Sequence, residues 1–427
     1  MVGGNWVDRC RDLGREVGTI VGHSLLGGMM STELSQQEVG NLRPVAPIPN
    51  KTATGVPAPP EGEAEARAYV ASQWQLMWWK FRKHKLAMIG GVVAILIYMI
   101  AIFAEFLAPT NPELYSARYT YAPPQRIHFI NNGPNGTEFG PYVNGYKVAI
   151  DPTALRRTFT IDPEQRYPIR LFAQGTPYKF LGIIPTDRHL IGPKDPTAPM
   201  YLLGTDRIGH DLLSRLIFGA RISMSLGLIG VVLSLVLGLA LGGASGYYGG
   251  AVDNIIQRVI EFLRSIPTIP LWLGLAAAVP KTWSPLQVYF AITLILSLIG
   301  WTGLARVVRG RFLSLREDDF VLSARLDGNS EARIIGRHMV PSFLSHIIAS
   351  LTLAIPGTIL AETTLSYLGL GLRSPINSWG VLLQEATNIR SVATAPWLLT
   401  PGLMVVLAVL ALNFLGDGLR DAADPYR

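Results

Sequence analysis

Several apolar runs of bilayer-crossing length constrain this chain more than any other feature of its sequence. About 20 consecutive apolar residues are enough to cross the hydrocarbon core of a membrane as a helix. Hydrophobic residues make up 49% of the 427 residues and charged residues only 16%, whereas soluble domains carry charge on roughly a quarter of their residues. The sequence therefore predicts an all-α polytopic membrane protein.

Six apolar runs are expected to span the membrane as helices. The third run is short, and an earlier start within Ile255–Phe262 stays open. The expected spans are Leu86–Leu107, Ile222–Ala244, Pro267–Val279, Leu286–Leu304, Phe343–Leu365 and Pro396–Leu415.

Basic residues set the expected orientation of these spans. Lys and Arg occupy four of the six positions 80–85, directly before the first span, and such clusters stay on the cytoplasmic side. With six spans, both termini are then cytoplasmic, as in a multi-pass protein of a bacterial or archaeal plasma (inner) membrane. This topology accounts for the net charge of +7 better than binding to nucleic acid does. The external link between the third and fourth spans holds only Lys281, and the last external segment, with Arg373 and Arg390, is a mild exception.

The first two regions of the chain lead into the membrane. Residues 1–75 are polar and poorly patterned, which predicts a disordered cytoplasmic region. Translation could start at Met1 or at Met30. Residues 76–108 form a membrane-entry segment, rich in Trp and basic residues, followed by the first helix.

Two further regions complete the expected organisation. Residues 109–202 form an extracytoplasmic insert that contains short β-like segments, and Asn135 begins a weak glycosylation sequon there. Residues 203–427 form the core with the other five helices. Within this core, the amphipathic segment Leu203–Arg221 is expected to lie along the outer surface before the second span.

A polar, arginine-rich segment, Phe320–Pro341, separates the fourth and fifth spans. Its Asp327–Ser330 stretch predicts a turn with a helix on either side, and Gly328 permits a positive φ at that turn. We interpret the cytoplasmic loop 313–341 as a fixed lever that passes force between a soluble partner and the membrane helices.

Two sets of side chains in this loop suit a docking role. The apolar residues of its first helix, Val321, Leu322 and Ala324, are expected to enter a groove on a partner. The arginines either pair with acidic residues of that partner or only enforce topology, and a solvated connector is the alternative interpretation. These arginines are Arg325, Arg333 and Arg337.

Enzymatic chemistry finds no support in the sequence. The chain lacks a P-loop and an H-E-x-x-H helix, its seven histidines are scattered, and its single cysteine is Cys10. We expect no catalytic residue, metal or bound cofactor. Ser223 and Ser366 are expected to serve helix packing.

Transport without an external energy source is an alternative that the residues leave open. The expected spans hold only Glu105 and Glu362 as acidic residues, both near span ends, whereas proton-driven carriers use ionisable groups inside the membrane. No selectivity filter is evident either. A self-sufficient channel or secondary carrier is therefore kept as the second hypothesis.

The loop resembles the coupling loop of ABC-importer permeases, whose pattern is E-A-A, a glycine four residues later, and a terminal proline. The glutamate of that pattern is replaced by leucine, which removes any salt bridge from this position. The matching residues are Leu322, Ser323, Ala324, Arg325, Gly328 and Pro341.

Further motifs resemble the second, C-type permease of the oligopeptide/dipeptide/nickel uptake group. They lie before the second span, after it, beyond the fifth span and at the C-terminus, and His210 stands where the group usually has arginine. The signature residues are Gly204, Thr205, Asp206, Asp211, Arg215, Gly250, Asp253, Arg258, Gly369, Gly371, Gly416 and Asp417.

This resemblance implies a permease subunit of an ATP-driven importer, with six helices of the type I kind. It implies a homologous second permease as heterodimer partner, two cytosolic ATPase subunits that bind ATP and Mg²⁺, and an extracytoplasmic solute-binding protein. The expected cargo is a peptide or a related small solute, moved by alternating access. The insert is expected to help dock the binding protein or to roof the cavity.

Overall fold

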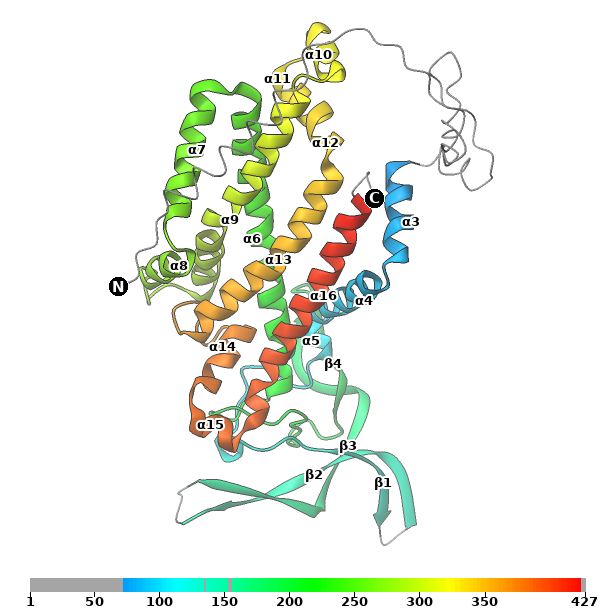
Figure 1. Ribbon diagram of the computed structural model, residues 1–427. Coiled ribbons are helices and arrows are strands. Elements are labelled where there is room, and N and C mark those ends of the chain that lie inside the picture. Colours follow the sequence, from blue (N-terminus) through cyan, green and yellow to red (C-terminus); the bar gives the residue numbers. More distant parts are fainter. Residues whose placement is uncertain (1–71, 134–135, 153–155, 424–427) are drawn as a thin grey trace, which may run out of the picture. The chain divides into compact units, whose positions relative to one another are not determined.

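The computed structural model describes residues 72–133, 136–152 and 156–423. The expected disordered region up to residue 71, the two candidate start sites and the sequon asparagine lie outside these residues. Figure 1 shows long helices side by side, with β-strands at one end of them and the short helices α10 and α11 at the other.

Five helices are long and apolar enough to cross a membrane, and a bent pair makes a sixth span possible. The pair consists of α7 and α8, which meet at 85°. If this pair forms one span, the third span includes the earlier helix that the sequence left open. The bounds are α4 Lys85–Ile102, α6 Leu212–Tyr248, α7 Gly250–Ser265, α8 Thr268–Ala277, α9 Pro285–Leu315, α13 Leu344–Tyr367 and, after the 3₁₀ turn η5 Pro396–Leu399, α16 Thr400–Ala423.

The expectation of a separate surface helix over Leu203–Arg221 is wrong. Residues 212–221 are the first turns of α6, which continues without a break to Tyr248. Asp211 caps the helix by accepting a hydrogen bond from the Ser214 N–H at 2.9 Å, as an N-cap aspartate does. The backbone hydrogen bonds of this helix continue through its amphipathic first turns. Hydropathy depends on side chains alone, so it identifies only the apolar part of the helix.

Helix α6 packs against α9, α13 and α4 within the described part of the chain. Glycines make the closest of these approaches possible: a Cβ built on Gly242 would lie 2.5 Å from the Ala305 carbonyl oxygen on α9. On Gly227 it would lie 2.8 Å from Ile359 on α13. The small residues that the sequence places in this span therefore serve tight helix contacts.

The expected β-containing insert is confirmed. It is one antiparallel sheet in the order β1-β2-β3-β4. The Phe180 ring of β3 lies 5.7 Å from the ring of Phe103, just past the end of α4. The β3–β4 turn is thus placed beside the end of the first span, with Ile183 80% exposed. The strands are β1 Ile127–Gly133, β2 Gly136–Ile150, β3 Arg157–Phe180 and β4 Ile184–Pro193.

Short elements complete the described chain. Helix α3 precedes the first span, and α5 follows it. The loop after α9 folds into α10, α11, the π-helical turn η3 and α12, and three short elements follow α13. Their bounds are α3 Gln73–Lys83, α5 Ala104–Leu107, η2 Ala117–Tyr119, α10 Asp319–Leu326, α11 Glu331–Arg333, η3 Ile334–Met339, α12 Val340–Ser342, α14 Trp379–Gln384, η4 Glu385–Thr387 and α15 Ile389–Thr394.

Candidate functional site

The turn at Gly328 has the geometry that its sequence predicts. Gly328 has a φ of +74°, and its N–H donates to the Arg325 carbonyl at 3.1 Å. The Ala324 carbonyl accepts from the Asn329 backbone N–H at 3.3 Å and from its side-chain amide at 3.0 Å. These bonds satisfy carbonyls at the end of α10, as a left-handed residue after a helix commonly does. The two helices of the loop are therefore held at a defined angle.

One face of α10 is buried inside the protein. Val321 is fully buried and Ala324 is 4% exposed, and both belong to a hydrophobic cluster with Phe312, Ile334 and Met339. The expectation that Val321 and Ala324 enter a partner's groove is therefore wrong. They lie three residues apart, so they share the helix face that packs on the rest of the chain.

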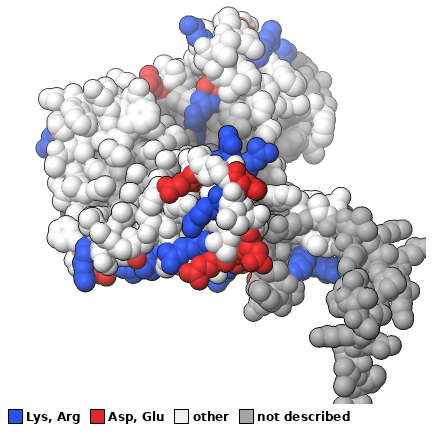
Figure 2. Space-filling model, turned by 90° about the horizontal axis from the view of Figure 1, so that it is seen from above, with Lys and Arg blue, Asp and Glu red and all other residues white. Residues whose placement is uncertain are grey.

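Other apolar side chains of α10 are exposed, and of these Leu322 and Leu326 lie on the side opposite the buried face. Phe320, Leu322 and Leu326 are 41%, 43% and 89% exposed, and Ser323 and Pro341 are exposed as well. Leu322, which replaces the motif glutamate, thus contributes an apolar side chain to this surface. Figure 2 looks onto this end of the molecule and shows basic and acidic side chains close together over it.

The arginines of the loop differ in their surroundings. Arg325 lies over the ring of Tyr247 at 5.6 Å and donates to its hydroxyl at 3.4 Å, which joins α10 to the end of α6. Arg333 donates to the side-chain oxygen of Asn329 at 3.4 Å. Arg325 therefore braces the loop within the chain, in addition to any pairing with a partner.

An ion pair braces the helices beneath the loop. Arg309 of α9 donates through two nitrogens to the carboxylate of Asp253 on α7, both at 2.5 Å. The Ser245 hydroxyl of α6 donates to the same carboxylate at 2.5 Å. The signature residue Asp253 thus connects α6, α7 and α9. Arg258 pairs with Glu261 one turn away, at 2.8 Å, and is 83% exposed.

A second polar cluster lies at the other end of α6. One Asp206 oxygen accepts the backbone N–H groups of residues 208, 209 and 210 at 2.8, 2.8 and 2.9 Å. The other accepts from His210 Nδ1 at 2.6 Å and from Arg215. Arg215 also donates to the Asn377 side chain at 2.7 Å. His210 therefore takes part in the cluster although it replaces the usual arginine.

The two signature aspartates of this cluster have opposite electrostatic character. Burial acts to raise the pKa of Asp206, but the His210 hydrogen bond and the Arg215 charge outweigh it and hold that pKa at about 2. Burial raises the pKa of Asp211 to about 6 despite its hydrogen bonds with Ser214. Among the described residues, Asp211 Oδ1 is buried with no hydrogen-bond partner, which fits a carboxyl that readily takes a proton.

The other signature residues before α6 hold this segment in place. Gly204 has a φ of +76°, and a Cβ there would lie 2.8 Å from the Ala122 carbonyl oxygen. The Thr205 hydroxyl accepts from the Ala122 N–H at 2.7 Å. These contacts join the segment to residues that precede the sheet insert.

Sequence reasoning missed the fully buried Glu362 of α13 as a polar centre. It accepts hydrogen bonds from the hydroxyls of Ser366 at 2.8 Å, Ser378 at 2.9 Å and Ser223 at 3.3 Å. Ser223 and Ser366 do join packed elements, as expected, but they do so through this carboxylate. The available signal was the glutamate itself, an ionisable residue within an apolar span.

The remaining signature residues permit close packing or a turn. Gly369 has a φ of +76°, and a Cβ on Gly371 would lie 2.6 Å from the Ser366 nitrogen. A Cβ on Gly416 would lie 2.6 Å from Leu353. Gly250 has a φ of +54°, and Asp417 is exposed. The predicted residues thus fall into several separate clusters and form no single site.

The described residues contain no group of three or more His, Cys, Asp or Glu side chains placed to hold a metal ion. These clusters share a structural role. They fix the loop 313–341 at one end of α6 and hold the polar segments in place at its other end.

Two family models match the chain. Residues 214–426 match the binding-protein-dependent transport system inner membrane component. Residues 72–124 match the N-terminal transmembrane domain of oligopeptide transport permease C. Together they cover most of the described helices and leave the sheet insert between them.

Curated relatives carry corresponding names. The oligopeptide transport system permease protein OppC of Haemophilus influenzae is 37% identical over 241 residues, which are 56% of this chain and 75% of the relative. OppC of Escherichia coli K12 is 41% identical over 226 residues, 53% of this chain and 72% of the relative. The dipeptide transport system permease protein DppC of Haemophilus influenzae is 30% identical over 352 residues, 82% of this chain and 94% of the relative.

Among solved structures, a chain of the MetNI methionine ABC transporter in an inward-facing conformation matches with a TM-score of 0.39 at 18% identity. The match covers 49% of this chain and 96% of that chain.

Proposed function

Because the chain belongs to the family of binding-protein-dependent transport system inner membrane components, in its oligopeptide permease C branch, we propose that its cargo is a peptide. The chain is a membrane-spanning permease subunit of an ABC importer, and the ATPase activity of such importers lies on partner subunits. The peptide cargo is supported by its relatives, which are named as oligopeptide and dipeptide permeases.

The path for the cargo lies between this chain and a second, homologous permease. The apolar surfaces of several spanning helices support this arrangement, because large side chains such as Ile95 of α4, Val236 of α6 and Leu403 of α16 are 63%, 59% and 67% exposed in the isolated chain. Such surfaces face either lipid or another helix bundle. The second permease therefore completes a path that this chain lines from one side.

The lever for transport is the loop 313–341, which we refer to as the coupling loop. In this proposal one ATPase subunit grips its exposed side chains Phe320, Leu322 and Leu326 and moves the loop when the two ATPase subunits close on ATP. The buried face of α10 then passes that movement to α9 through the contact of Val321 with the cluster around Phe312. Alternating access follows when the helices of the two permeases rock together.

The orientation of the chain follows from this role. Both termini and the coupling loop lie in the cytoplasm, and the sheet insert lies outside, where it helps to dock the solute-binding protein. The chain binds no cofactor itself, because ATP and Mg²⁺ are held by the ATPase subunits. The observation that carries the proposal is the ordered turn at Gly328 with an apolar face left exposed beside it.

Reconstitution tests the proposal directly. Proteoliposomes that contain this chain, the second permease and both ATPase subunits should take up a labelled tripeptide only with ATP and the binding protein present. Uptake by vesicles that contain this chain alone would instead favour a self-sufficient channel or carrier. If the complete assembly takes up no peptide but does take up another solute that the binding protein delivers, the cargo is of another class.

A further inference from the structure

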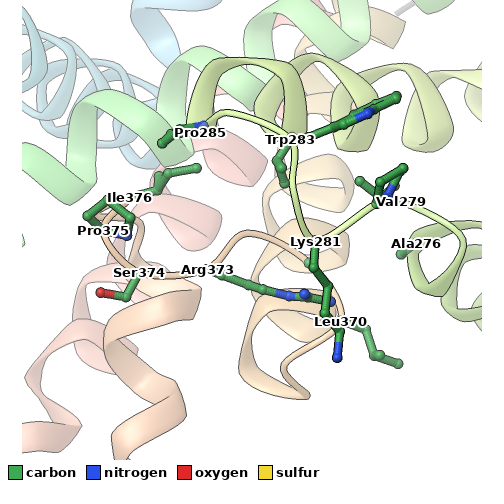
Figure 3. Close-up of a pocket in the computed structure, with 13 residues that line it drawn as sticks. Ala276, Val279, Lys281, Trp283, Pro285, Leu370, Arg373, Ser374, Pro375 and Ile376 are labelled. Carbon is green, nitrogen blue, oxygen red and sulfur yellow. The ribbon is translucent and has the colours of Figure 1, made fainter.

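A pocket of about 230 Å³ lies between the link that joins α8 to α9 and the loop that follows α13. Figure 3 shows Lys281 of the link and Arg373 of the loop lying next to each other in it. These two cations are far apart in the sequence, and both fall in expected external segments, where the positive-inside bias makes cations less common. The fold therefore gathers two external cations that topology disfavours.

Neither cation has an acidic partner in the part of the chain that the structure describes. No carboxylate lines the pocket, and neither side chain is paired in any ion pair or hydrogen bond between described residues. Two like charges held near each other repel, and they repel less once an anion lies between them. The pocket thus has a positive electrostatic potential that favours a negatively charged group.

The start of α9 adds to this positive potential. Ser284 caps the helix, and Pro285, its first residue, lines the pocket. The N-terminal end of a helix carries a partial positive charge and favours anions. Three independent sources of positive potential therefore meet at one place.

The rest of the lining is largely apolar. Trp283, Val288 and Leu370 contribute to it, and Figure 3 shows the Leu370 side chain near the two cations, whereas the Trp283 ring points away from them toward Val279. Sites for whole small molecules measure roughly 300–1,000 Å³, so this smaller space suits one end of a longer ligand. A carboxylate with an apolar group next to it matches the lining.

We propose that this pocket receives the carboxyl-terminal residue of the peptide cargo, with its carboxylate between Lys281 and Arg373 and its side chain against Leu370. The proposal rests on the proposed function, in which the cargo is a peptide. Arginine is suited to this task because its planar group can donate two parallel hydrogen bonds to a carboxylate. The permease would then select for a free C-terminus.

The experiment compares a labelled tripeptide with the same tripeptide amidated at its C-terminus. Uptake of both is measured in proteoliposomes that contain the complete assembly and saturating binding protein, with the parent chain or with the double variant Lys281→Gln/Arg373→Gln. The binding protein is the same in both preparations. Its own preference for the free or the amidated peptide therefore cancels when the uptake by the variant is divided by the uptake by the parent. Arg390→Gln, which removes another exposed external cation, is the matched control.

We expect the double variant to lower uptake of the free acid about tenfold or more, the size expected for hydrogen bonds to a charged group, and to leave uptake of the amide unchanged. The charge-retaining swap Lys281→Arg/Arg373→Lys should recover much of the uptake, which distinguishes charge recognition from misfolding. Arg390→Gln should behave like the parent.

Two results would overturn this assignment while peptide transport itself stands. Equal loss of both peptides, together with weaker association of the binding protein, would give the pocket to an acidic side chain of that protein. Unchanged uptake of both peptides by the double variant would leave the pocket without a role in transport. If the parent assembly takes up neither peptide but carries another solute, the proposed cargo fails and the pocket assignment fails with it.

Discussion

Replacement of Gly328 by alanine tests whether the coupling loop needs one defined turn or only a flexible link. Gly328 has a φ of +74°, and a Cβ built on it meets no atom within 4 Å. The substitution therefore creates no clash, and its whole effect comes from the backbone. An L-residue in this left-handed conformation costs about 1–2 kcal/mol relative to glycine.

That cost acts on the conformation that docks. If the ATPase subunits bind only the turn seen here, the ratio of the competent conformation to all others falls by about 5- to 30-fold, and the apparent Kd rises by up to the same factor. The measurement is a titration of the solubilised permease pair with purified ATPase subunits. Peptide-stimulated ATP hydrolysis should fall in parallel at subsaturating ATPase concentrations.

Two further variants make the test specific. Gly328→Asn should bind within about twofold of the parent, because asparagine visits the left-handed region far more readily than alanine. Gly336→Ala is the matched control, since its Cβ also meets no atom within 4 Å and its φ is not positive. Parent-like binding by Gly328→Ala, or an equal loss for Ala and Asn, would refute the argument from the turn.

Three other perturbations test separate parts of the structure. Asp253→Asn removes the charge that pairs with Arg309 at 2.5 Å. We expect the free energy of unfolding to fall by about 1–3 kcal/mol, measured as a lower unfolding temperature. An unchanged unfolding temperature would show that the α7–α9 contact is redundant. Burial raises the pKa of Asp211 to about 6, so the folded state gains up to about 3 kcal/mol of stability as the pH falls from about 7 to about 4. The unfolding temperature of the parent should therefore rise over this pH range, and that of Asp211→Asn should not. Identical pH profiles for the two proteins would contradict the assignment. Ile183 is 80% exposed on a turn beside the end of α4, so the emission that Ile183→Trp adds to that of the nine native tryptophans should be quenched by brominated lipids. Quenching of this added emission only by aqueous iodide would place the turn in water.

Local pattern was sufficient for five of the six expected spans and for the turn, because both depend on short-range properties of the sequence. Apolar length marks a spanning helix, and the residues 327–330 contain their own turn signal. Helix ends were less predictable. The first turns of α6 are amphipathic, yet the chain has no reason to break there, so the helix begins well before the apolar run, at the cap formed by Asp211.

The roles of the side chains could not be predicted from local pattern, because they depend on contacts between residues far apart in the chain. Val321 and Ala324 look equally available for docking in the sequence, but Phe312 and Met339 of neighbouring elements cover them. The same reasoning applies to the external cations. Each is an isolated external cation when taken alone, and only the pairing of the α8–α9 link with the loop after α13 brings Lys281 and Arg373 into one anion-binding pocket.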